Sequence, residues 1–98
     1  MSDLSQQFQG EPRPGPWRHM NSSRVQRARY DSGLGEIQVY FADGTPWRYK
    51  DVPYNVWRNF SRSASPGRYI NRVLNGFDYE RGPEGGFDPA AEVDEESM

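Results

Sequence analysis

Cysteine is absent from the 98 residues, and histidine occurs once, at His19. Without cysteine the chain has no disulfide framework and no thiolate metal site, so nothing in it indicates an oxidising compartment. A single histidine, with no triad-like order of Ser, His and Asp, argues against nucleophilic catalysis. The lack of a His or Cys cluster argues against zinc. We therefore expect a protein that is not an enzyme and needs no cofactor.

Long apolar runs are also missing, and only 34% of the residues are hydrophobic. No stretch is long enough for the core of a signal peptide or for a membrane span. The sequence therefore predicts a protein that is neither secreted nor inserted in a membrane.

Lysine is scarce as well, because eleven of the twelve basic residues are arginine. All twelve lie in the range 13–81 with only six acidic residues, whereas the two ends of the chain are acidic. Arginine suits bidentate contacts to phosphate or carboxylate, although a high-GC genome would also favour it. A basic middle with an acidic tail indicates an acidic partner, a tail that folds back over the middle, or a tail that docks elsewhere.

Proline and glycine concentrate near the ends, where large apolar side chains are rare. This composition predicts an extended N-terminal arm at 1–20, a folded domain at 21–81 and an acidic C-terminal arm at 82–98. A domain of about 60 residues can fold alone. The aromatic residues that we expect to anchor the arms are Phe8, Trp17 and Phe87.

Three strands are predicted in the first half of the domain, at 25–30, 34–41 and 46–50. In the second of them Ile37, Val39 and Phe41 alternate with polar or amphipathic residues, and an Asp-Gly pair marks a tight turn to the third. We expect Arg24, Arg27 and Arg29 to point largely outward from the first strand. The result is an antiparallel meander with one apolar face.

Two short helices are predicted to cover that face. Pro53 suits the first turn of one helix, which presents Val56, Trp57 and Phe60 as an apolar stripe. Ser65 and Pro66 suit the N-cap and first position of the next helix, and an Asn-Gly pair with a left-handed glycine, Gly76, suits its end. The predicted fold is a small α+β domain: a three-stranded antiparallel meander capped by two short helices, with two extended arms.

The candidate contacts to an acidic partner are all arginines. They are Arg24, Arg27, Arg29, Arg58, Arg62, Arg68 and Arg72. The start of the second helix, Ser65 to Arg68, is either an anion site or an ordinary N-cap with solvated arginines. The domain's tyrosines and tryptophans are interpreted as core and rim, with a ligand-stacking face as the alternative.

A family resemblance rests on Val52-Pro53 followed by Ala64-Ser65, Gly67 and Tyr69, together with the strand Leu34 to Phe41. These residues resemble the KTSC domain, a small module found at the C-terminus of some lysyl-tRNA synthetases and as a stand-alone protein in bacteria and phages. The resemblance covers about residues 21–79. Pro66 stands where lysine is common in the family and Ile70 where phenylalanine is common, which weakens any inference of a dedicated charge site there. The resemblance implies a fold and no specific activity.

The function predicted first is a non-catalytic structural or interaction protein, namely a phage virion-associated accessory protein. It would dock onto capsid or other virion neighbours through its arms and basic core, in the virion or the host cytoplasm, with a homo-oligomer as an open alternative to a monomer. The alternative is a module that binds RNA or DNA, since basic residues interleaved with aromatics are typical of such proteins.

Overall fold

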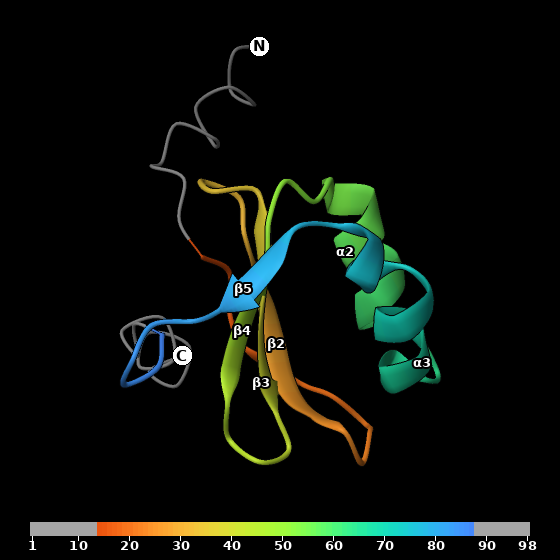
Figure 1. Cartoon of the computed structure of the whole chain (residues 1–98). Coiled ribbons are helices and arrows are strands. Elements are labelled where there is room, and N and C mark those ends of the chain that lie inside the picture. The colour runs from red at the N-terminus through yellow and green to blue at the C-terminus, as the bar shows by residue number, and fades with distance from the viewer. Residues whose placement is uncertain (1–13, 88–98) are drawn as a thin grey trace, which may run out of the picture.

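The computed structural model describes residues 14–87, which form an antiparallel sheet with a layer of helices on one face (Figure 1). The elements are β1 (Arg18–His19), β2 (Val25–Asp31), β3 (Glu36–Phe41), β4 (Pro46–Tyr49), α2 (Tyr54–Ser61), α3 (Pro66–Arg72), η1 (Leu74–Gly76) and β5 (Tyr79–Arg81). The five strands lie side by side in the order of the sequence. The predicted α+β class is confirmed.

The predicted number of strands is wrong, because a short strand is added at each edge of the sheet. β1 pairs Arg18 with Ala28 of β2, and β5 pairs Tyr79 with Tyr49 of β4. Both strands are only two or three residues long and consist of exposed residues, so neither has the apolar alternation by which a strand is recognised in a sequence. The second predicted strand also begins later, at Glu36, because Leu34 lies in the preceding turn.

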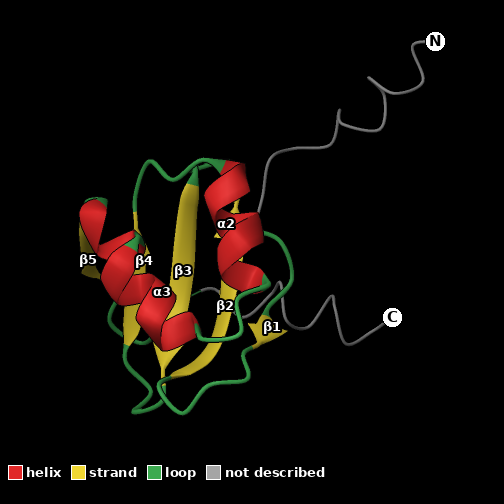
Figure 2. Cartoon of the chain, turned by 90° about the vertical axis from the view of Figure 1, so that its right-hand side faces the viewer, coloured by secondary structure: helices red, strands yellow, loops and turns green. Residues whose placement is uncertain are grey.

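The core lies between the sheet and the helices, which cross one face of it (Figure 2). Period-two alternation places Ile37 and Val39 of β3 on this face, where both are fully buried. Phe60 of α2 and Ile70 of α3 pack against them and are equally buried. The predicted apolar stripes of the helices therefore cover the predicted face of the sheet.

Proline starts both helices, in two different positions. Pro53 is the N-cap of α2 and not part of its first turn, whereas Ser65 caps α3 with Pro66 at its first position, as predicted. The predicted left-handed cap at Gly76 is wrong, because the chain continues into η1 and the glycines with positive φ lie elsewhere.

The other face of the sheet is covered as well, which alternation did not predict. Glu36 and Gln38 of β3 each expose only 3% of their surface, and Arg29 of β2 exposes 2%. The expectation that Arg29 points out to solvent is wrong. Trp17, next to β1, and Phe87, in the segment after β5, are buried on this second face beside Arg29.

Candidate functional site

The helices leave part of the sheet's core face open beside the β3–β4 hairpin. An open groove with a volume of about 610 Å³ lies there, between the strands and η1. The lining side chains on which the site depends are Arg24, Phe41, Trp47, Tyr49, Asn75 and Tyr79. We call this surface the groove. Four of these six residues are aromatic, so the groove combines ring surfaces with a cation at its rim.

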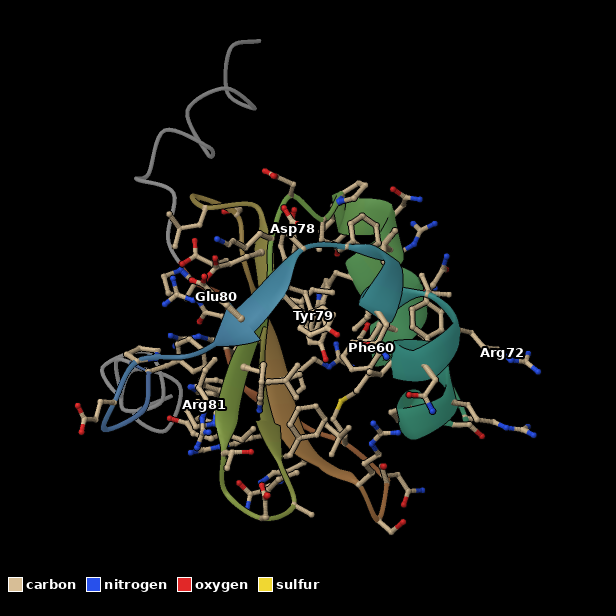
Figure 3. All side chains as sticks on the ribbon, in the orientation of Figure 1. Phe60, Arg72, Asp78, Tyr79, Glu80 and Arg81 are labelled. Carbon is tan, nitrogen blue, oxygen red and sulfur yellow. The ribbon has the colours of Figure 1, made fainter. Side chains whose placement is uncertain are left out.

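The aromatic wall of the groove is built by two neighbouring strands. Alternation along β4 places Trp47 and Tyr49 on the core face, and the β4–β5 register sets Tyr79 opposite Tyr49. The ring of Tyr79 lies 5.5 Å from that of Tyr49 and 6.1 Å from that of Trp47, centroid to centroid. Tyr79 is half exposed, and Figure 3 shows it on the helix side of the sheet. Its ring is therefore accessible to a ligand.

Two guanidinium groups flank these rings. The Cζ atom of Arg24 lies 5.9 Å from the centroid of Phe41, and that of Arg81 lies 5.9 Å from the centroid of Trp47. Arg24 also donates a hydrogen bond from Nη1 to Oδ1 of Asn71 in α3, over 3.3 Å. Arg24 thus connects the groove to the helical layer. Arginine over an aromatic face is held in place while its N–H groups stay available to an anion.

Two titratable groups of the groove have shifted pKa values. Burial raises the pKa of Tyr49 to about 12, so its hydroxyl is neutral at physiological pH. Hydrogen bonds from the hydroxyl and the backbone N–H of Thr45 lower the pKa of Asp43, and this carboxylate is occupied in closing the hairpin turn. The residues that line the groove include no histidine or lysine that could serve as a general base. The groove can stack a planar ring and contact an anion.

On the second face, polar side chains form a buried ladder across three strands. Arg29 donates from Nε to Oε1 of Gln38 over 2.7 Å, and Gln38 donates from Nε2 to Oε2 of Glu36 over 2.7 Å. Nε of Arg48 approaches the same carboxylate oxygen at 3.8 Å. Because buried polar groups are costly unless they are paired, this ladder is what allows Arg29 to be buried.

Aromatic rings cover the ladder. The Cζ atom of Arg29 lies 4.4 Å from the centroid of Trp17 and 5.8 Å from that of Phe87. Trp17, Tyr40 and Phe87 contact one another with centroid separations of 5.1 to 6.0 Å. The Tyr40 hydroxyl accepts a hydrogen bond from the backbone N–H of Phe87 over 2.8 Å. We call this contact between the two terminal segments the clasp.

The seven predicted arginines do not form one surface. Arg24 lies at the groove, whereas Arg27 and Arg29 belong to the second face, where Arg27 is half-buried against Trp17. The remaining four, Arg58, Arg62, Arg68 and Arg72, are exposed on α2 and α3. Of the predicted arm anchors, Trp17 and Phe87 lie in the clasp and Phe8 lies outside the described residues.

The predicted anion site at the start of α3 has few donors. α3 has only seven residues, Pro66 contributes no N–H, and Ser65 makes no side-chain capping bond. Binding of an anion there stays a prediction, and the groove has the more complete set of contacts.

Tyr79 and Arg81 were missed as site residues because their roles depend on pairing between β4 and β5. The signal available in the sequence is an aromatic residue, Tyr79, shortly after the last helix. Within residues 14–87, no group of three or more acidic, His or Cys side chains is placed to hold a metal ion. No helix in this part of the chain is both long and apolar enough to cross a membrane.

Comparison with known proteins supports the fold. The model of the KTSC domain matches residues 21–79. A crystal structure of a KTSC domain protein from Yersinia pestis superposes with a TM-score of 0.62 at 26% sequence identity, covering 68% of this chain and 96% of the other. A search of the curated proteins found no match. Trp17 and Phe87 lie outside the matched range 21–79, whereas all the groove residues named above except Arg81 lie within it.

Proposed function

This chain belongs to the KTSC domain family, and from the groove built on that fold we propose that it is a non-catalytic module that binds single-stranded nucleic acid. The observation that carries the proposal is the half-exposed ring of Tyr79, which lines the groove together with Arg24 and contacts Trp47, the ring over which the guanidinium group of Arg81 lies. Bases stack on aromatic rings and phosphates contact arginine, which is the usual combination in sequence-tolerant single-strand binders.

The roles of the groove residues follow from their exposure. Tyr79 provides the stacking face, since half of its surface is open, and Trp47 supports it from below. Arg24 in the groove and Arg81 beside Trp47 supply the guanidinium groups that contact the phosphates. Asn75 has a side-chain amide that can hydrogen-bond the edge of a base. The hydroxyl of Tyr49 stays neutral at physiological pH, so it adds no negative charge that would repel phosphate.

Single strands are favoured over duplexes because the rings must reach an unstacked base. In a duplex the base faces are stacked on their neighbours, and only their edges are available in the grooves. A ring half-exposed inside a groove, as Tyr79 is, suits a splayed-out base. RNA and DNA share this chemistry, so both are to be tested.

The test is a titration of the intrinsic tryptophan fluorescence with oligo-uridylate and oligo-thymidylate of about 4 nucleotides, a length within the footprint of known single-strand modules. Because one stacked base contributes about 1–3 kcal/mol, Tyr79→Ala should weaken binding by roughly 5- to 150-fold. Tyr79→Phe keeps the ring and should bind like the unaltered chain. A difference between the two oligonucleotides would identify the sugar that is preferred.

Salt dependence tests the arginines separately. Replacing both Arg24 and Arg81 by Gln should lower the slope of log K against log salt by about 1.4, since each phosphate contact to a single strand contributes about 0.7. Lys50→Gln is the matched control, because Lys50 lies near Glu80 on the second face, away from the groove. If neither oligonucleotide binds at low salt, or if Tyr79→Ala binds normally, the proposal is wrong.

A second candidate is the virion-associated accessory protein, and the position of the two ends of the described part of the chain supports it. Trp17 and Phe87 contact each other at a centroid separation of 6.0 Å on the second face. The described ends of the chain therefore lie on the side of the sheet opposite to the helices (Figure 1). Arms that leave from this side would reach virion neighbours while the groove and helices stay free.

This candidate is tested by trimming the chain to residues 14–87, which keeps the clasp. If the arms dock the protein, the trimmed chain should melt like the full chain but no longer be incorporated into particles of the phage that carries the gene. Normal incorporation of the trimmed chain would rule out docking through the arms.

A further inference from the structure

A second aromatic site lies at the opposite side of the helical layer from the groove. It is a cavity of about 320 Å³, and its main lining residues are Arg18, Tyr30, Tyr54 and Trp57, with Pro16 at the edge. We call it the cradle. Nothing in the groove's geometry depends on it, and no residue lines both sites.

The rings of the cradle are held in a fixed arrangement that leaves one of them open. Tyr30 stacks on Trp57 at 6.2 Å with an interplanar angle of 22°, and Tyr54 meets Tyr30 edge-on at 5.6 Å. The Tyr30 hydroxyl donates a hydrogen bond to the carbonyl oxygen of Val52 over 2.8 Å, which fixes its ring. Tyr54 is 58% exposed although it is a large aromatic residue. The cradle thus presents the Tyr54 ring on a rigid support.

The charged side chains of α2 near the cradle are positive. Tyr54 and Arg58 are spaced at i, i+4 and so share one face of α2, and Arg62 is the C-cap that follows this helix. Arg18 borders the cradle from β1 and is exposed. The nearest carboxylate by sequence, Asp31 beside Tyr30, accepts hydrogen bonds from the backbone N–H groups of the following turn. The side chains that line the cradle are therefore three aromatic rings, a cation, a proline and the hydroxyl of Ser32, with no carboxylate among them.

The helical layer joins the cradle to the groove. Residues 52–77 contain four arginines and no acidic residue. Figure 3 shows one of them, Arg72, pointing away from the body of the domain. Within residues 14–87 these four arginines form no ion pair. Arg24 reaches across from the groove to Asn71 of α3 and packs near Gly67, so basic residues extend from one aromatic site to the other.

We propose that the cradle is a second base-stacking site for the same nucleic-acid strand, whose phosphates cross α2 and α3 on the four arginines. This inference rests on the proposed function of the groove and extends it to a longer ligand. Arg68 and Arg72, like charges at i, i+4 on α3, destabilise the free protein slightly, and a polyanion removes that repulsion. An uncharged peptide would use the rings but would leave these arginines without a partner, so a nucleic acid is the better occupant.

Oligonucleotides of two lengths distinguish binding at the cradle from binding at the groove. A strand of about 4 nucleotides should fill the groove alone, whereas one of about 16 nucleotides, at the upper end of known footprints, should also reach the cradle. Tyr54→Ala should then weaken binding of the long strand by roughly 5- to 150-fold and leave the short strand unaffected. Tyr79→Ala should weaken both. Tyr54 is exposed, so the variant should fold, and Tyr54→Phe should bind like the unaltered chain.

The arginines of the helical layer are tested by salt dependence. Replacing Arg58, Arg62, Arg68 and Arg72 by Gln should lower the slope of log K against log salt by about 2.8 for the long strand, with no change for the short one. If Tyr54→Ala binds the long strand normally while Tyr79→Ala does not, the cradle site is wrong and the groove stands. If Tyr79→Ala binds both strands normally, the proposed function itself fails.

Discussion

The clasp makes a stability prediction that can be worked out from its contacts. Phe87 is the last residue that the structure describes, yet it exposes only 7% of its surface. It lies against Trp17 and Tyr40 and within 5.8 Å of the Cζ atoms of Arg29 and Arg48. Phe87→Ala should therefore destabilise the whole domain and not merely release a tail.

The size of the effect follows from the buried area. A buried aromatic side chain removes about 200 Å² from water, which is worth about 5 kcal/mol at 25 cal/mol per Å². Because the unfolded chain already buries part of this area, the stabilisation is lower by about 10–40%. In the variant the residues that precede position 87 are released and recover part of their conformational entropy, which lowers the expected loss of stability further. We expect a loss of about 3 kcal/mol, the lower end of measured Phe→Ala effects.

The assay is urea unfolding followed by circular dichroism, with a thermal melt in parallel. In a domain of this size a loss of about 3 kcal/mol lowers Tm by roughly 12–24 °C. The control is Leu34→Ala, because Leu34 is a large apolar residue that is 61% exposed and should cost less than about 0.5 kcal/mol. Hydrogen exchange of the Arg29 Nε–H gives a second readout, since loss of its cover should speed that exchange.

Equal stability of Phe87→Ala and Leu34→Ala would contradict the clasp. The second face would then be open to water in solution, and Arg29 would have no reason to be buried. The domain would end near residue 81, as its composition suggests, and not at residue 87.

Two further predictions concern a buried hydroxyl and a glycine. Because burial raises the pKa of Tyr49 to about 12 from about 10 in the unfolded chain, the folded state holds its proton more tightly, and stability should be unchanged up to about pH 9 and fall above it. At pH 11 this group alone should cost about 1.4 kcal/mol in urea unfolding, a loss that Tyr49→Phe should not show. A Cβ atom on Gly86 would overlap the Tyr40 hydroxyl, whereas one on Gly85 would meet nothing, although both glycines have positive φ. Gly85→Ala should therefore cost about 1–2 kcal/mol through backbone strain, and Gly86→Ala at least about 1 kcal/mol more through the lost bond to Phe87; equal thermal melts of the two variants would contradict this packing.

Local patterns in the sequence predicted the helix-covered half of the fold. Alternation in β3 assigned Ile37 and Val39 to the core, and the Ser65-Pro66 pair located the start of α3. These signals act over a few residues and need no knowledge of distant segments.

The second face and the groove depend on contacts between distant segments, which no local pattern records. Gln38 alternates as a solvent-facing residue should, yet it is buried and bonded to Arg29, which lies beside Phe87, a residue distant in the sequence. Tyr79 becomes part of a site only because β5 pairs with β4. Arg29 shows the same difficulty, since an arginine is expected at the surface unless rings and hydrogen-bond acceptors are supplied from elsewhere.

The closeness of Trp17 and Phe87 also bears on how such a domain can be joined to other proteins. A module whose two ends meet can be inserted into a surface loop of a host protein without stretching either chain. It can equally be circularly permuted, with a short linker between the old ends and new ends opened at an exposed turn such as Gly33. The same sheet and helices could therefore serve as a separate protein, as a terminal extension or as an internal insertion, with the groove left open in each case.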